Sequence, residues 1–102
     1  MPRNQSDERS ETDIIIRMLY YCTEPRLPSQ IMSFCDIDRD QFTRMSEHCI
    51  KKNLLKVVNA EMGMFGYVLT PRGRETLATA QLIMKELGVE DSEYKEKFHV
   101  GH

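Results

Sequence analysis

Apolar residues recur every three or four positions in four stretches of the chain, a spacing that is typical of amphipathic helices. The first stretch begins after Ser10, which with Asp13 resembles a capping box, and predicts a helix that opens at about residue 11. The second is brief and starts at Pro28. The third follows Asp38, and the fourth spans residues 71–87. The pattern therefore predicts four helices of unequal length.

The third helix has the clearest start in the sequence. Asp38 followed three residues later by Gln41 is a capping box, in which the two side chains satisfy each other's backbone N–H groups. Ile37 before the cap and Phe42 after it form a hydrophobic staple. The apolar side of this helix continues through Met45, Cys49 and Ile50, which we expect to face inward.

Between the third and fourth helices, the pattern predicts a β-hairpin with strands at residues 54–59 and 64–70. Asn53 is expected to end the preceding helix in the left-handed conformation. Alternation in the second strand predicts that Tyr67 and Leu69 face the core. Upstream, Leu27 lies between two prolines and is expected to supply a very short additional strand.

The fourth helix follows the hairpin without a loop. Thr70 is a plausible N-cap, and Pro71 suits the first helical position because its missing N–H would be unpaired there. Gly73 costs about 1 kcal/mol relative to alanine inside a helix, so we expect a close backbone approach at this position. Helices, a hairpin and a helix in this order predict a winged helix-turn-helix.

The predicted fold class is therefore α+β and mostly α, with three helices, a short β-hairpin wing and a C-terminal helix. The domain is expected to span residues 10–88, with the C-terminal helix at residues 71–87. Residues 1–9 are polar and predict a disordered N-terminal tail, and residues 89–102 predict a polar C-terminal tail.

Composition adds that the 102 residues are 40% hydrophobic and 29% charged, as in an ordinary soluble domain. No apolar run approaches the ~20 residues that span a bilayer, and the N-terminus is too polar for a signal peptide, which predicts a cytoplasmic protein. Cys22, Cys35 and Cys49 are odd in number and lack a CxxC pair, so we expect small buried hydrophobes in a reducing compartment.

The net charge of −2 is unevenly distributed. Residues 39–74 carry seven basic and three acidic side chains, a net charge of +4, whereas the segments on either side carry −3 each. Positive charge is thus concentrated in the third helix and the hairpin, which suggests a polyanionic partner.

The exposed side of the third helix carries the candidate binding chemistry, because a helix-turn-helix presents this face to base edges in the DNA major groove. Arg44 ranks first, since arginine can bond bidentately to guanine. The competing interpretation is a solvated face of mixed charge. The candidates on this face are Arg39, Asp40, Thr43, Arg44, Glu47 and Lys51, and the candidates for phosphate contacts are Ser29, Gln30 and Lys56.

Other chemistry is not expected. The sequence has no phosphate-binding glycine loop, no HExxH motif and no nucleophile elbow, so no catalytic residue is assigned. His48 and Cys49 are neighbours on a helix and point about 100° apart, which argues against a shared metal ion. No metal, cofactor or small-molecule ligand is predicted.

Two stretches resemble a known family. The segments FTRMSEHCIKKNLLKVV and GYVLTPRGRETL are similar to the archaeal small winged-helix regulators, which include the 10a-type chromatin-associated dimers of crenarchaea. The resemblance covers about residues 13–87 and implies a nucleoid-associated homodimer that binds double-stranded DNA through the third helix. The C-terminal helix carries a 3-4-3 apolar stripe that either docks on its own domain or pairs with a second copy, and the resemblance implies a dimer held by this helix. The stripe consists of Leu77, Ala80, Met84 and Leu87.

The chain departs from the family at the wing, where Glu61 lies at the tip and Lys56 is the only base. Met62, Met64 and Phe65 could instead form an exposed apolar patch, a feature that marks protein contacts. Two hypotheses therefore stand. The first is a DNA-binding homodimer that serves as a transcriptional regulator or chromatin protein, and the second is a winged-helix protein-interaction module without DNA binding.

Overall fold

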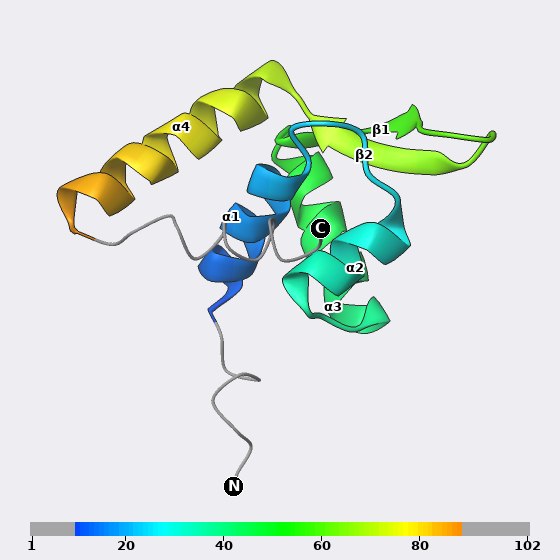
Figure 1. Cartoon of the computed structure of the whole chain (residues 1–102), viewed down its shortest axis with the longest axis horizontal. Coiled ribbons are helices and arrows are strands. Elements are labelled where there is room, and N and C mark those ends of the chain that lie inside the picture. Colours follow the sequence, from blue (N-terminus) through cyan, green and yellow to red (C-terminus); the bar gives the residue numbers. More distant parts are fainter. Residues whose placement is uncertain (1–9, 89–102) are drawn as a thin grey trace, which may run out of the picture.

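The order of elements in the computed structural model, which describes residues 10–88, is three helices, a hairpin and a helix. The elements are α1 (Glu11–Tyr21), α2 (Pro28–Cys35), α3 (Arg39–Lys51), β1 (Leu55–Asn59), β2 (Phe65–Leu69) and α4 (Pro71–Glu86). Figure 1 shows α2 lying across α3 and the hairpin at the C-terminal end of α3. The predicted winged helix-turn-helix is confirmed. The tails predicted at residues 1–9 and 89–102 lie outside the described residues.

Side-chain caps start three of the helices, as predicted. The Ser10 Oγ accepts a hydrogen bond from the Asp13 N–H at 3.0 Å, and the Thr70 Oγ1 accepts from the Gly73 N–H at 2.9 Å. At α3 the capping box is complete. The Asp38 carboxylate accepts from the Gln41 N–H at 2.8 Å, and the Gln41 Oε1 accepts from the Asp38 N–H at 3.2 Å. The start of α3 is thus fixed by its own sequence.

Left-handed residues end two of the helices. Asp36 closes α2 with φ 58°, and Asn53 follows α3 with φ 63°, as predicted for Asn53. Asn and Asp tolerate this conformation better than most residues because their short polar side chains can bond the local backbone. These two turns set the directions in which the chain leaves α2 and α3.

The core gathers apolar side chains from all four helices and the hairpin. Tyr20 and Tyr21 widen this core from α1, and the ring of Tyr21 stacks on Phe34 of α2 with centroids 4.3 Å apart. The residues buried most fully are Met18, Leu19, Cys22, Ile31, Cys35, Cys49 and Leu55. One core thus joins the helix-turn-helix to the hairpin.

The hairpin pairs Leu55 with Leu69 at its base and Asn59 with Phe65 toward its tip. A single bridge extends the sheet, in which Arg26 and Tyr67 exchange backbone hydrogen bonds of 2.9 and 2.8 Å. The extra strand predicted at Leu27 is therefore a one-residue bridge at the neighbouring position. It anchors the segment before α2 against β2.

The second strand faces the core as predicted. Leu69 is buried, and the ring of Tyr67 packs edge-on against Phe42 with centroids 5.6 Å apart. The prediction for Ile50 on α3 is wrong, because its side chain is 39% exposed. Ile50 lies at the edge of the apolar stripe, and the buried positions Met45 and Cys49 already fill the contact with the core.

The passage from β2 into α4 is the most tightly packed joint of the fold. A Cβ atom at Gly73 would collide with the carbonyl oxygen of Leu54, which confirms the predicted close approach. The Thr70 hydroxyl also donates to the carbonyl of Asn53, which precedes β1 at the same base of the hairpin. The first turn of α4 is thus locked to the segment that leaves α3. None of the helices within residues 10–88 is long and apolar enough to cross a membrane.

Candidate nucleic-acid interface

The outer face of α3 is a continuous polar surface. Its opposite face is buried through Phe42, Met45, Ser46 and Cys49, which hold the helix against the core. The Ser46 hydroxyl donates to the Thr43 carbonyl at 3.2 Å, so this polar group is satisfied inside the helix. All six predicted residues of the outer face are exposed, namely Arg39, Asp40, Thr43, Arg44, Glu47 and Lys51.

The charge of this face is mixed, with three basic and two acidic side chains among those six residues. Within residues 10–88, Arg39 and Lys51 have no ion-pair partner. Arg44 does have one. Its Nη1 lies 3.3 Å from the Glu11 Oε2 in the first turn of α1, with the two side chains 60% and 68% exposed. The residue ranked first for base contact is therefore held by a carboxylate from another helix.

The three residues predicted to contact phosphates lie on α2 and on β1 of the hairpin. Ser29 is exposed in the first turn of α2, and Lys56 is exposed on β1. Gln30 is half-buried, and its Oε1 accepts a hydrogen bond from the Leu27 N–H at 2.8 Å. It also lines a polar hollow of about 180 Å³ together with Glu61 of the wing. Gln30 thus has a structural role in starting α2, which the sequence analysis missed.

The interior of the helix-turn-helix holds three cysteines that form no disulfide, Cys22, Cys35 and Cys49, all of them buried as predicted. Burial raises the pKa of Cys22 to about 12 and that of Cys49 to about 11, because an apolar environment disfavours the thiolate. The thiols of Cys22 and Cys49 therefore stay protonated near neutral pH. His48 is exposed while Cys49 points into the core, so the two do not converge on one site.

The hairpin tip is apolar and open. We call the exposed residues Val57, Met62, Met64 and Phe65 the wing patch. Met62 is 92% exposed and Phe65 is 67% exposed, as predicted for both. Val57 was not predicted. It lies opposite Tyr67 in the register, a pairing that by itself would have placed it on the core side of the hairpin, yet it is 50% exposed.

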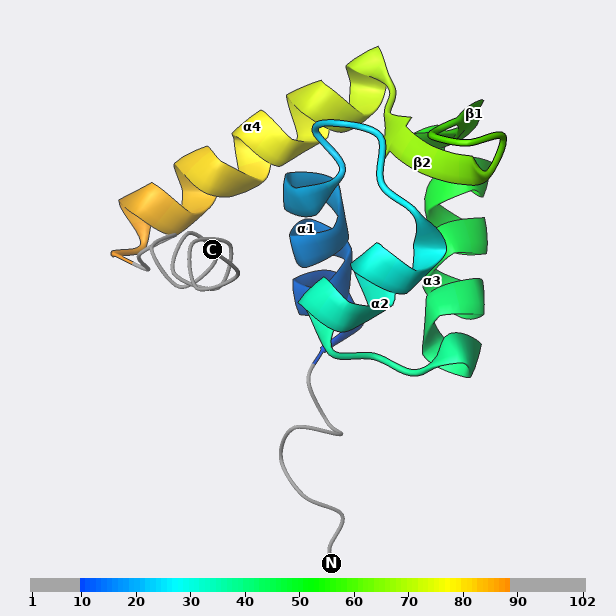
Figure 2. The same ribbon diagram turned by 45° about the vertical axis from the view of Figure 1, so that its right-hand side comes forward.

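The fourth helix divides into two halves. Leu77 is only 7% exposed and belongs to the core of its own chain, so it is not available to a second chain. Ala80 and Met84 are half-buried, and Leu87 is 72% exposed, together with the exposed Leu82 and Ile83. Figure 2 shows the C-terminal half of α4 projecting away from the helix-turn-helix.

A groove of about 450 Å³ separates α1 from α4. Its walls are mostly apolar, and the half-buried Ile16 of α1 lies along it. The residues that line the groove are Thr12, Ile15, Ile16, Leu19, Arg72, Glu75, Thr76, Thr79, Ala80 and Ile83.

Comparison with known proteins supports the fold. No protein-family model matches the chain, and no curated protein does. A MarR family transcription regulator of known structure superposes with a TM-score of 0.58 at 18% identity, over 95% of this chain and 69% of that one. A MarR family regulator from Silicibacter pomeroyi gives 0.57 at 13% identity, over 94% and 70%. A MarR-like regulator from Thermotoga maritima gives 0.57 at 18% identity, over 99% and 77%.

These three proteins are described as transcription regulators, and their likeness extends over almost the whole of this chain. At 13–18% identity, the likeness establishes the winged-helix fold and leaves the chemistry of the site to the residues of this chain.

Proposed function

We propose that the chain is a DNA-binding winged-helix protein, a transcriptional regulator or a chromatin-associated protein, and not an enzyme. The observation that carries the proposal is the outer face of α3, an exposed polar surface on the second helix of a helix-turn-helix. In such motifs this helix enters the major groove. The three structural neighbours, which are transcription regulators, support the same proposal.

Each side chain of the face has a chemical role in this proposal. Arg44 is suited to a bidentate bond with guanine, and Arg39 and Lys51 supply positive charge to the phosphates. Asp40 and Glu47 can accept from the amino group of cytosine, which would favour particular sequences. Ser29 on α2 and Lys56 on β1 would fix the register on the DNA backbone.

The test is fluorescence anisotropy with mixed-sequence duplex DNA at low salt. The wild type should bind in the range of about 10⁻⁴–10⁻⁶ M that is typical of non-specific binding. Arg44→Ala should weaken binding several-fold, whereas Lys85→Ala should not. Lys85 is an exposed base at the far end of α4, so the control removes the same charge away from the proposed interface. Absence of binding by the wild type at tens of micromolar protein would refute the proposal.

We further propose that the protein acts as a homodimer held by α4. Three residues of the predicted stripe, Ala80, Met84 and Leu87, continue beyond the core onto the projecting half of the helix. Together with Leu82 and Ile83 they leave an apolar surface that a second copy would cover. The resemblance to the 10a-type dimers supports the same arrangement. It also supports a cytoplasmic location in association with the nucleoid.

Sedimentation equilibrium tests the dimer. The wild type should sediment at twice the chain mass of 12.0 kDa, and Ile83→Asp with Leu87→Asp should return it to the monomer. Glu86→Lys, which alters charge beside the same surface, serves as the matched control and should leave the dimer intact. A wild type that stays monomeric at high concentration would remove this part of the proposal.

The wing patch favours a second candidate, a protein-interaction module. Met62 adopts a left-handed φ of 54°, which is unfavourable for a methionine, and presents its side chain almost entirely to solvent. Within the described residues, the base nearest the tip on the hairpin is Lys56, and Glu61 lies beside Met62. This candidate predicts no DNA binding by the wild type, and loss of partner capture in Met62→Ser with Phe65→Ser while the fold persists.

A further inference from the structure

The contact between Glu11 and Arg44 joins two residues 33 positions apart in the sequence. Glu11 lies in the first turn of α1, and Arg44 lies at the middle of the outer face of α3. The 3.3 Å separation is a charge-assisted hydrogen bond as well as an ion pair. A carboxylate of the helix-turn-helix domain therefore occupies the guanidinium that the proposed function assigns to DNA.

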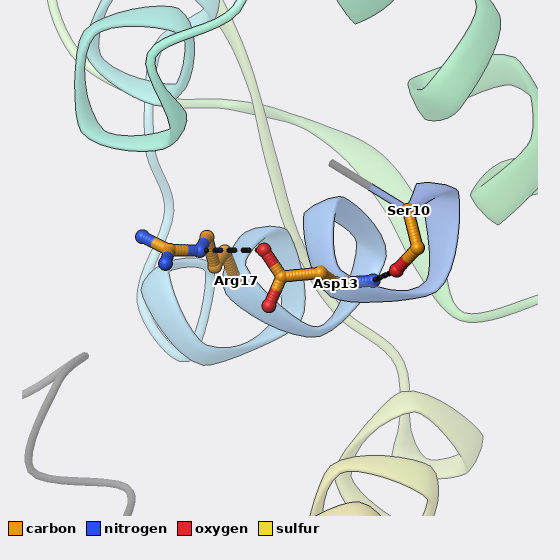
Figure 3. A network of polar contacts seen from close by, with 3 residues as sticks. All are labelled: Ser10, Asp13 and Arg17. Carbon is orange, nitrogen blue, oxygen red and sulfur yellow. Dashed lines mark hydrogen bonds and ion pairs between the residues drawn. The ribbon is translucent and has the colours of Figure 1, made fainter. Parts of the chain in front are cut away.

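The other acid of the same turn, Asp13, bonds neighbours in its own helix and cap. The Asp13 carboxylate accepts from the Arg17 Nε at 3.1 Å along α1, and the Asp13 N–H is bonded to Ser10. Figure 3 shows Asp13 between these two partners, with its carboxylate directed along the helix toward Arg17. Glu11 is thus the acid of this turn that reaches across to α3.

We propose that Glu11 is a built-in competitor for DNA, which lowers the affinity and the salt dependence of DNA binding by holding Arg44. This inference rests on the proposed function, since it concerns the same face of α3. A phosphate or a guanine that takes Arg44 must first displace Glu11. The displaced carboxylate then remains beside the DNA, where its negative charge faces the phosphates.

The competition should be modest in size because both side chains are more than half exposed. Exposed ion pairs are screened by water and salt, and their removal typically changes an equilibrium by up to about fivefold. The salt dependence should respond more clearly. Without Glu11, Arg44 would bind the DNA and leave no unpaired acid beside it, so binding would release about one more counterion.

The experiment compares five proteins by anisotropy on one mixed-sequence duplex over a series of salt concentrations. They are the wild type, Glu11→Gln, Arg44→Ala and the double variant, with Glu86→Gln as the matched control. Glu86 is an exposed acid in the last turn of α4. Figures 1 and 2 show that this end of α4 lies far from α3. Glutamine keeps the length of the side chain and removes only its charge. Circular dichroism on each variant verifies that α1 stays folded.

The expected result has three parts. Glu11→Gln binds DNA about two- to fivefold more tightly than the wild type, and its plot of log K against log salt is steeper by about one. Glu86→Gln changes neither quantity to that extent. In the Arg44→Ala background, Glu11→Gln gives no more than the effect of Glu86→Gln, because the residue through which Glu11 acts is gone.

Other outcomes overturn the inference in distinguishable ways. If the wild type binds DNA and Glu11→Gln matches Glu86→Gln, the competitor role fails while the proposed function stands. If the gain persists unchanged without Arg44, Glu11 acts by direct repulsion of phosphate and the inference is wrong. If no variant binds DNA at low salt, the proposed function itself fails, and the inference fails with it.

Discussion

Helices α3 and α4 start alike and end differently. Each begins at a polar N-cap whose side chain accepts from the backbone N–H three residues on, at Asp38 and Thr70. The central apolar positions of the 13-residue α3 are buried in its own chain, and the face left over is polar. The 16-residue α4 is buried only at Gly73 and Leu77, and its second half exposes large apolar side chains.

The difference indicates what kind of partner each helix can take. The packing of α3 is complete within one chain, so its exposed charged side chains can bind a polar, charged ligand, Arg44 after it leaves Glu11. The second half of α4 lacks cover, and exposed apolar surface of this kind is stabilised by another apolar surface. This difference supports the proposal that α3 binds DNA and α4 binds a second copy, and each prediction below tests one side of the comparison.

The largest effect on stability is expected in the first half of α4, which packs into the core of its own chain. Leu77→Ala should cost about 2–5 kcal/mol in the free energy of unfolding, because it opens a cavity in the core. Leu87→Ala, ten residues further along the same stripe, should change it by less than about 0.5 kcal/mol at low protein concentration, since the side chain is exposed. Urea unfolding measures both. Equal costs would contradict the division of α4 into two halves.

The joint that positions α4 should come next. Gly73→Ala places a Cβ against the Leu54 carbonyl oxygen, a backbone atom that cannot easily move, and should cost about 3 kcal/mol. Gly63→Ala is the control, because a Cβ there meets nothing within 4 Å and only the φ of +77° is unfavourable. We expect about 1 kcal/mol from it. If the two variants melt alike in thermal unfolding, close packing at Gly73 is not what fixes α4.

Alkaline pH tests the buried side of α3. The Cys49 thiol keeps its proton in the folded state because burial raises its pKa from 9.0 to about 11. The unfolded chain releases that proton near pH 9, so stability is fully present below pH 9 and is lost as the pH rises toward 11. The expected loss is about 1.4 kcal/mol per pH unit from this thiol.

Cys49→Ala provides the comparison, since the other groups that titrate at high pH are common to both proteins. The slope of the free energy of unfolding against pH between 9 and 10 should be shallower in Cys49→Ala. Cys22, whose pKa burial raises to about 12, should still contribute in the variant. Parallel curves for the two proteins would show that Cys49 ionises as easily folded as unfolded.

The smallest effect is expected at the start of α3. Asp38→Ala removes the acceptor of the 2.8 Å hydrogen bond from the Gln41 N–H and should cost about 1 kcal/mol. Asp40→Ala makes the same change two residues later on the exposed face, where it should cost less than about 0.5 kcal/mol. Chemical denaturation distinguishes them, and a larger cost at Asp40 would mean that the exposed face of α3 is tied to the fold.

The sequence alone predicts those parts of the fold that depend on neighbours in the chain. The capping box at Asp38, the cap at Thr70 and the turn at Asn53 each follow from residues within four positions of one another. The close approach at Gly73 was inferable because glycine is unfavourable inside a helix without such a reason. Burial of Cys49 followed from helical periodicity.

Contacts between distant residues could not be predicted in this way. The pair of Glu11 and Arg44 depends on how α1 crosses α3, and nothing local marks either residue. Exposure of Ile50 depends on how far the core extends around α3. The hydrogen bond of Gln30 could have been predicted, since glutamine at the third position of a helix often accepts from the N-cap N–H. Leu27 at the N-cap has no polar side chain to complete the capping box, so the motif was not recognised.

The central claim is that α3 takes DNA and the second half of α4 does not. Nuclear magnetic resonance on the ¹⁵N-labelled protein, titrated with a short duplex at low salt, tests it most directly. We expect chemical-shift changes at the amides of the α3 face around Thr43, Arg44 and Glu47. The amide shifts of Leu82 and Leu87 should stay unchanged. Shifts confined to the wing patch or to α4, or no shifts at all, would contradict it.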